Sequence, residues 1–186
     1  MPFFRKSPAG DPLAVTMVGV KRGDRFLAVG MRDTPLIAAL AAKSGLTGRA
    51  CAVDADEARV TAGAAAIERE GALIEAVRAP WGMLPYDAES FDIVVMRDLL
   101  MTLPVQARVL AANGVYRVLR PGGRVVVIEP APRGGFVGAL LNRQQGDPDY
   151  VTAGGAVAAL TQAGFGAVRQ LAEHEGQVFV EGIKRA

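Results

Sequence analysis

The chain has 186 residues, of which 51% are hydrophobic and 22% are charged, and this composition excludes a disordered chain and indicates a folded globular protein. Its 21 basic and 19 acidic residues give a net charge of +2, so neither nucleic acid nor an anionic membrane surface is expected as its partner. The single cysteine, Cys51, excludes an internal disulfide and favours a cytoplasmic location, and no apolar run is long enough for a membrane span.

The length fits one domain with a continuous core, and we expect a single domain over residues 1–186. Residues 1–10 are expected to form a loose arm, and they lack the hydrophobic region of a signal peptide. Helices are predicted at 12–18, 35–43, 56–70, 105–119 and 152–163, with Thr34 and Thr152 as caps of the second and the last. Strands are predicted at 26–29, 49–53, 73–78, 91–96, 124–128, 167–172 and 177–183, with a turn at 121–123.

This alternation of strands and helices predicts an α/β fold. The fourth and fifth strands are nearly all apolar, which is typical of parallel strands that helices cover on both faces of the sheet. The last two strands are joined only by Glu173–Gly176, and so short a connection requires them to be antiparallel.

The junction between the first strand and its helix is a candidate ligand site. Gly30 is the first residue after the apolar run and can turn freely, and Pro35 suits the first turn of a helix. In α/β sheets, ligands bind at such junctions because free backbone N–H groups and the positive end of the helix converge there.

Several sequence segments together resemble the class I S-adenosylmethionine-dependent methyltransferases, and among them the small-molecule enzymes that include the quinone-biosynthesis C-methyltransferases. The segments are GDRFL at 23–27, LPYDAESFDIV at 84–94, YRVLRPGGR at 116–124 and AGF at 163–165. The resemblance covers residues 12–186. It implies a doubly wound, Rossmann-like sheet of seven strands in the order 3-2-1-4-5-7-6, with strand 7 antiparallel and helices on both faces.

The resemblance also implies a site for S-adenosylmethionine across the carboxyl ends of strands one, two and four. Gly30 would lie under the methionine part of the cofactor. Asp54, followed by Ala55, matches the acid that accepts hydrogen bonds from the ribose hydroxyls, and the region around Trp81 would lie near the adenine. Arg97 follows strand four at the same edge and, with Asp98, is a candidate to hold a ligand or to transfer a proton.

Departures from the family pattern weaken this expectation. The acid that the family carries on the first strand corresponds to Ala28, and of the three glycines only Gly30 is kept, since Arg32 and Thr34 occupy the other two positions. The acid that contacts adenine corresponds to Pro80–Trp81 and is also missing. Because a Cβ at these glycine positions obstructs close approach of the cofactor, we expect S-adenosylmethionine to bind weakly or not at all.

Arg32 has two interpretations. In the first, Arg32 binds a carboxylate or phosphate of a ligand through two parallel hydrogen bonds, because a cation at a helix N-terminus is unfavourable unless an anion is near. The alternative is a solvated arginine that pairs with Asp33.

The other candidates have structural alternatives as well. Asp54 would instead cap the following helix, and Trp81 and Tyr86 would line the adenine or substrate pocket or pack a loop onto the sheet. Glu129 would face the same cleft or act as a cap, while His174 is expected to be exposed. Catalytic residues are not identified, because neither a metal-site spacing nor a Ser/His/Asp set is present.

Two functions follow from these observations. The first is methyl transfer from S-adenosylmethionine to a small molecule. The second is an inactive methyltransferase-like binding or assembly module that has lost the cofactor, and a nucleotide-like ligand held through Arg32 is a third, weaker option. The short insertion Pro130–Tyr150 indicates an open cleft or one closed by a second subunit, and Phe3–Phe4 and Phe136–Val137 are candidate contacts of such a homodimer.

Overall fold

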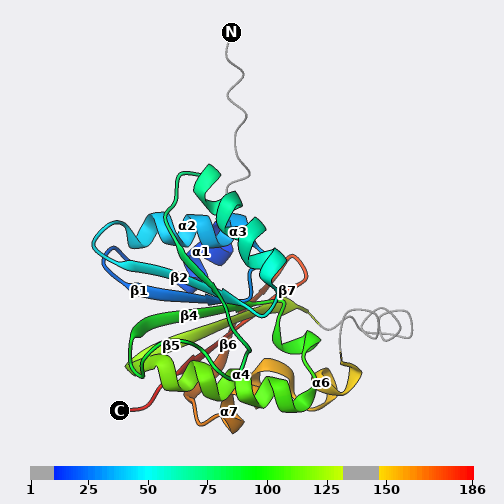
Figure 1. Cartoon of the computed structure of the whole chain (residues 1–186). Helices are drawn as coiled ribbons and strands as arrows, with labels where there is room; N and C mark the ends of the chain where they lie inside the picture. Colours follow the sequence, from blue (N-terminus) through cyan, green and yellow to red (C-terminus); the bar gives the residue numbers. More distant parts are fainter. Residues whose placement is uncertain (1–10, 132–146) are drawn as a thin grey trace.

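The fold is described by a computed structural model for residues 11–131 and 147–186. The arm at 1–10 and both candidate dimer contacts lie outside these residues. Seven strands form one sheet in the order β3-β2-β1-β4-β5-β7-β6, with β7 antiparallel to both of its neighbours (Figure 1). The strands are β1 Arg25–Val29, β2 Arg49–Asp54, β3 Glu75–Arg78, β4 Phe91–Arg97, β5 Leu119–Pro130, β6 Gly166–His174 and β7 Gln177–Ile183. The predicted strand order is therefore confirmed.

Helices cover both faces of this sheet (Figure 1). The helices α1 Pro12–Val18, α2 Thr34–Ser44 and α3 Glu57–Arg69 pack on one face. The other face is covered by α4 Val105–Val118, α6 Pro148–Thr152 and α7 Gly155–Gln162, and a short 3-10 turn, η1 Leu100–Thr102, leads into α4. Among the described residues, every helix is too short or too polar to cross a lipid bilayer.

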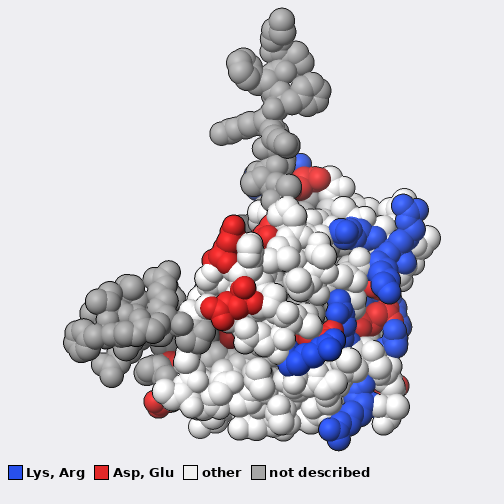
Figure 2. Space-filling model, turned by 180° about the vertical axis from the view of Figure 1, so that it is seen from behind, with Lys and Arg blue, Asp and Glu red and all other residues white. Residues whose placement is uncertain are grey.

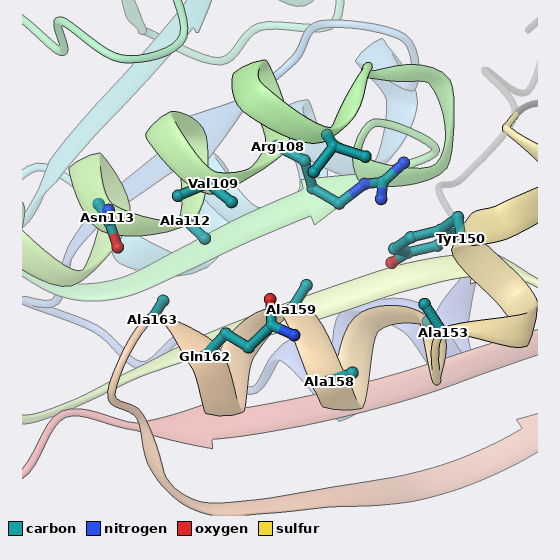
Figure 3. A pocket seen from close by; sticks show the side chains of 12 residues that line it. Arg108, Val109, Ala112, Asn113, Tyr150, Ala153, Ala158, Ala159, Gln162 and Ala163 are labelled. Atoms are coloured by element: carbon teal, nitrogen blue, oxygen red, sulfur yellow. The ribbon is translucent and has the colours of Figure 1, made fainter.

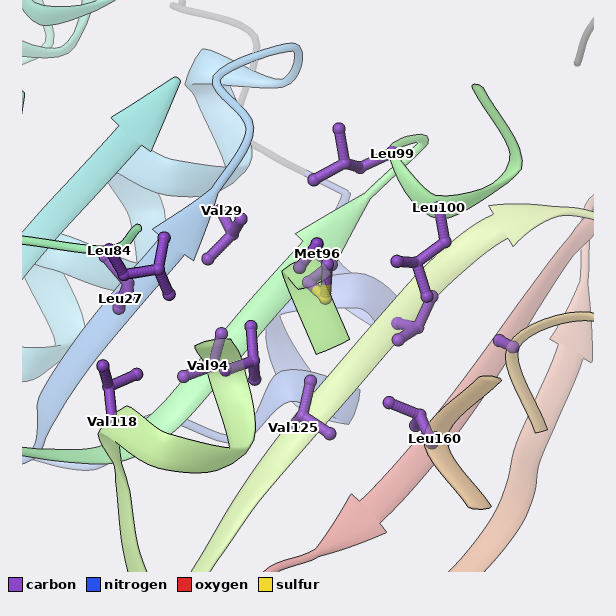
Figure 4. Packing of buried hydrophobic residues seen from close by; sticks show 14 of the residues in the cluster. Leu27, Val29, Leu84, Val94, Met96, Leu99, Leu100, Val118, Val125 and Leu160 are labelled. Atoms are coloured by element: carbon purple, nitrogen blue, oxygen red, sulfur yellow. The ribbon is translucent and has the colours of Figure 1, made fainter. Parts of the chain in front are cut away.

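The core is a double layer because the central strands bury both of their faces. Phe26, Val94 and Val126 are fully buried in the middle of β1, β4 and β5. Figure 4 shows side chains of the layer under α4 and α7, where Leu27 and Val29 of β1 face the same cluster as Leu99 and Leu100. This packing fixes the carboxyl ends of β1, β4 and β5 in one rigid edge.

The second helix begins one residue earlier than predicted. Asp33 is its cap, since the Asp33 Oδ1 accepts a hydrogen bond of 3.0 Å from the N–H of Leu36, and Thr34 is already helical. A carboxylate is favoured over a hydroxyl at this position by the partial positive charge of the helix end.

Two other boundaries differ from the prediction. Residues 121–123 are part of β5 rather than a turn, because the backbone of Gly122 and Gly123 bonds to Lys184 beyond β7. The predicted helix at 152–163 is two helices. Gly154 and Gly155 have φ of +96° and +57°, which interrupts the helix, so Thr152 ends α6 and Gly154 caps α7.

Candidate functional site

The carboxyl ends of β1 and β4 are the point at which the strand order of the sheet reverses, which is where ligands bind in doubly wound folds. Gly30 follows β1 with φ of +91°, and its N–H bonds to the carbonyl of Val53 at 2.8 Å. A Cβ placed on Gly30 would lie 3.6 Å from the side chain of Leu99, which is 1% exposed. The backbone turn is thus formed as predicted, and the buried side chain of Leu99 covers it.

Asp54 ends β2 beside this turn, and its carboxylate faces inward. Its side chain is 1% exposed. The Oδ2 accepts a hydrogen bond of 2.9 Å from the N–H of Met31, and the Oδ1 accepts one of 3.0 Å from Asp56. Arg59 adds its Nε at 3.7 Å from Oδ2. The carboxylate therefore holds together the loops that follow β1 and β2. We call Gly30–Asp33 and Asp54 the cradle.

An ion pair spans the switch point. Arg97, the last residue of β4, places its Nη1 3.0 Å from the Oδ2 of Asp33, in an ion pair without the direction of a hydrogen bond. The Nε of Arg97 lies 3.8 Å from Asp98, a non-glycine residue with φ of +51°, and burial raises the pKa of the Asp98 carboxyl. The strand ends that would flank a bound cofactor are thereby joined to each other.

Arg32 does not take part in this pair. Its side chain is exposed, and in the described part of the chain no ion pair joins it to Asp33, whose Oδ2 is directed to Arg97 instead. The expected pairing of Arg32 with Asp33 is therefore wrong. The reason is geometric, because Asp33 uses Oδ1 for the helix cap and can offer Oδ2 to the strand beside it.

The remaining predicted site residues are dispersed. The carbonyl of Ala55 accepts a hydrogen bond of 3.3 Å from Arg78 Nε, and half-buried Trp81 packs on the core beneath α4. Tyr86 lies at the opposite, amino end of the strands, where its ring meets that of Phe91 edge-on at 4.9 Å. Of the two alternatives for Tyr86, the structure shows the second, in which it packs its loop onto the sheet.

The residues that correspond to the family's cofactor site make contacts with one another and with the backbone. The acid that would meet the ribose is buried and has backbone partners on both oxygens. A Cβ on Gly30 would be in van der Waals contact with Leu99, and the Asp33–Arg97 ion pair joins the start of α2 to the end of β4.

Glu129, at the end of β5, is the second buried carboxyl of this edge and is 7% exposed. Its Oε1 accepts a hydrogen bond of 2.9 Å from the N–H of Met101, and the hydroxyl of Tyr150 donates to Oε2 at 2.7 Å. Burial raises the pKa of Glu129 to about 7, against the hydrogen bonds, which lower it. A carboxyl that changes charge near neutral pH therefore lies at the end of β5.

Arg108 completes this network from α4, and the sequence analysis did not single it out. Its Nε donates to the carbonyl of Leu100 at 3.0 Å, and its Nη2 donates to Leu103 and to Asp147 Oδ2, both at 2.8 Å. Figure 3 shows the guanidinium beside Tyr150, and it lies 4.3 Å from the centre of the ring. The available signal was its spacing, since it shares the buried face of α4 with Ala111, Ala112 and Val115.

We call Arg108, Glu129, Asp147 and Tyr150 the α6 anchor, because they attach α6 to the end of β5 and to the loop at 99–103. The anchor reaches the cradle through this loop. Met101 donates its N–H to Glu129 and accepts the N–H of Asp147 at 2.9 Å, and Leu99 lies two residues before it. The side chain that covers Gly30 is thus held in place by a network centred on Glu129.

Metal and histidine chemistry find no support at this edge. The described residues contain no group of three or more His, Cys, Asp or Glu side chains placed to hold a metal ion. His174 ends β6 with an exposed side chain, as predicted, and lies 3.7 Å from Glu175.

Comparison with known proteins gives consistent results. Residues 27–127 match the family described as a methyltransferase domain. The ubiquinone/menaquinone biosynthesis C-methyltransferase UbiE of Escherichia fergusonii is 29% identical over 113 residues, which cover 60% of this chain and only 44% of that relative. A methyltransferase structure from Aquifex aeolicus superimposes with a TM-score of 0.74 at 18% identity over 94% of both chains. A Haloferax volcanii methyltransferase in complex with the activator Trm112 gives 0.70 at 15% identity, covering 94% of this chain and 88% of that one.

Proposed function

The chain belongs to the class I S-adenosylmethionine-dependent methyltransferase family, and we propose that it is a member whose cofactor cradle is closed and that it serves as a binding or assembly module. Its ligand under this proposal is a small molecule or a partner protein rather than a methyl donor. Of the site residues predicted from the sequence, Gly30, Arg32 and Asp54 are parts of the cradle in this proposal, Arg97 pairs with it, and Ala55 and Trp81 lie outside it.

The single observation that carries the proposal is the state of Asp54. This residue is the only acid of the family's cofactor site that the sequence retains, and its side chain is 1% exposed with both oxygens bonded to backbone N–H groups. Each oxygen keeps a second lone pair, but a ribose could reach it only if the loops around this enclosed carboxylate moved apart. Breaking the bond to a buried N–H donor in this way costs about 1–3 kcal/mol, and this cost is subtracted from the affinity for the cofactor.

Calorimetric titration with S-adenosylmethionine and S-adenosylhomocysteine tests the proposal directly. We expect dissociation constants weaker than about 0.1 mM for both. Circular dichroism of the same sample establishes that the protein is folded. A low-micromolar affinity for either ligand contradicts the proposal.

Methyl transfer to a small molecule is the second candidate, and the match of residues 27–127 to the methyltransferase domain favours it. Because the similarity to UbiE covers less than half of that enzyme, a quinone precursor is only the first acceptor to try. Incubation with methyl-labelled S-adenosylmethionine and such a precursor should transfer no label above a protein-free control. Labelled product would establish this second function in place of the first.

A protein partner that opens the cradle would reconcile the two functions. The Haloferax volcanii neighbour, which was solved with a methyltransferase activator, supports this as a way of working for the fold. Size-exclusion chromatography with light scattering shows whether the simplest such partner, a second copy of the chain, binds, and calorimetric titration of that sample with S-adenosylmethionine shows whether the cradle has opened.

A further inference from the structure

A cavity of about 430 Å³ lies between the sheet and the α6–α7 segment. It borders Glu129 and Tyr150 of the α6 anchor and none of the cradle residues. Strands β5, β6 and β7 line one side of it. Its inner wall is aliphatic and includes Val127, Ala156 and Val180, all of them buried. A volume of this size with apolar walls and few polar groups is typical of sites for small molecules.

The polar side chains that line the cavity differ in their burial. Glu129 and Tyr150 lie in the buried part, whereas Gln170 and Glu173 are exposed and mark the mouth. Among the described residues that line the cavity, two are acidic and none is basic. Tyr150 also borders the smaller groove between α4 and α7 in Figure 3, and it is that groove, not this cavity, which Arg108 lines.

The surrounding charges favour a cation in the cavity. Basic residues gather at the far, amino edge of the sheet, where Arg25, Arg49 and Arg120 lie at the starts of β1, β2 and β5. Figure 2 shows lysine and arginine side chains concentrated along one side of the molecule. Among the described residues, a ligand beside Glu129 is therefore closest to carboxyl groups, because the guanidinium of Arg108 is engaged by three oxygens of its own.

We propose that this cavity binds a small organic ammonium, with the charged nitrogen at Glu129 and an apolar body against the valines of β5 and β7. Each oxygen of Glu129 accepts one hydrogen bond from the protein, from Met101 or from Tyr150, and keeps a second lone pair for the ligand. Glu173 at the mouth adds attraction for a cation and repels an acid. The cavity is lined by none of the cradle residues, so amine binding can be measured without S-adenosylmethionine.

The proposal predicts a pH dependence, because an ammonium ligand favours the ionised form of Glu129. The groups that face Glu129 are Arg108 on α4, Tyr150 on α6 and Asp98 after β4, with Glu173 on β6 lining the same cavity. With a pKa of about 7, the free carboxyl is largely protonated at pH 6 and ionised at pH 8. An amine that stays protonated over this range should bind about tenfold more tightly at pH 8 than at pH 6.

Calorimetric titration with three probes of one shape tests this: phenethylamine, phenethyl alcohol and phenylacetate. We expect the amine to bind with the stated pH dependence, the alcohol to bind more weakly and without it, and phenylacetate not to bind. The proposal is overturned if the alcohol or the acid binds as tightly as the amine, or if none of the three binds at millimolar concentration. These titrations contain no S-adenosylmethionine, so their failure is distinct from a failure of the proposed function.

Variants locate the binding. Glu129→Gln should weaken the amine about tenfold at pH 8 and abolish the pH dependence, while Glu175→Gln, which removes an exposed charge outside the cavity, should change neither. If Glu129→Gln does not fold, Val157→Phe provides the second test. Val157 is 40% exposed at the cavity, so a larger side chain there should block the amine, whereas Val105→Phe on α4 should not. Unchanged amine binding in Val157→Phe contradicts the location.

Discussion

The carboxyl ends of β1 and β5 lie on the same edge of one sheet, yet one is filled and the other is hollow. At β1, the carboxylate of Asp54 accepts a hydrogen bond from the backbone, Asp33 pairs with Arg97, and the side chain of Leu99 lies beside Gly30. At β5, the polar side chains anchor α6 and leave an aliphatic cavity beside them. The difference teaches that two strand ends on one edge of the same sheet can be packed differently, with side-chain contacts at β1 and a cavity two strands away at β5.

The largest expected effect breaks the anchor that separates these two regions. Arg108→Met keeps the length and apolar contact of the side chain but removes the guanidinium. Asp147 then loses its ion-pair partner, the carbonyl of Leu103 loses the Arg108 donor, and the carbonyl of Leu100 keeps only the N–H of Leu103. We expect the free energy of unfolding to fall by about 4 kcal/mol, as for other buried ion pairs that lose one member, measured by urea unfolding.

The matched control is Arg32→Met, since Arg32 is exposed in the cradle loop. Its effect should stay within about 0.5 kcal/mol. Equal losses in the two variants would mean that Arg108 contributes no more than an arginine at the surface, and the anchor would not exist as described.

The second effect concerns pH and Glu129. In the native state the carboxyl of Glu129 has a pKa of about 7, whereas in the unfolded chain its pKa is near the ordinary value of 4.5. The contribution of this group to stability is thus fully present below pH 4.5 and is lost as the pH rises to about 7. The total loss is about 3 kcal/mol.

Glu129→Gln isolates this term, because the amide imitates the protonated carboxyl at every pH. The difference in unfolding free energy between the variant and the natural chain should therefore shift in favour of the variant as the pH rises from 5 to 8. Acids with lowered pKa values, such as Asp92 and Glu75, change stability in the opposite direction and cancel in this comparison. A difference that does not vary with pH would show that Glu129 is ionised throughout.

The fold was predictable because its signals are local. The apolar run of β4, the free turn at Gly30 and the short connection before β7 each fix one step of the topology. The strand order itself came from the resemblance to the methyltransferase family and is confirmed. The errors at Thr34 and Thr152 are also local, since Asp33 competes as a cap and paired glycines interrupt the last helix.

The site was less predictable because its partners are distant in sequence. Asp33 and Arg97, which form an ion pair, are 64 positions apart in the sequence. Glu129 is hydrogen-bonded to Met101, 28 positions before it, and to Tyr150, 21 positions after it. Nothing adjacent to Leu99 indicates that its side chain covers Gly30. Sequence patterns could name the residues at the strand ends, but which of them satisfy each other depends on packing that only the assembled sheet defines.

A smaller effect tests the closed cradle through Asp54→Ala. Removing the carboxylate leaves the N–H groups of Met31 and Asp56 without their acceptor, and we expect a loss of about 2 kcal/mol in unfolding free energy. Asp87→Ala, at an exposed loop position, is the control and should be neutral. A neutral Asp54→Ala would mean that the carboxylate is free for a ligand, which would favour ribose contact over the structural role.

The smallest effect distinguishes Arg32, which belongs to the cradle, from Arg97, which pairs with it. Arg97→Ser removes the ion pair that a ligand entering between β1 and β4 would have to break, and it leaves the helix cap of Asp33 intact. Affinity for S-adenosylmethionine should then improve about fivefold, the equivalent of about 1 kcal/mol for a half-buried pair. Arg32→Gly, which changes an exposed side chain, should leave the affinity as it is. Both are measured by calorimetry at high cofactor concentration. The reverse result, a gain from Arg32→Gly alone, would place the obstacle at the missing glycine and show that the Asp33–Arg97 pair opens without cost.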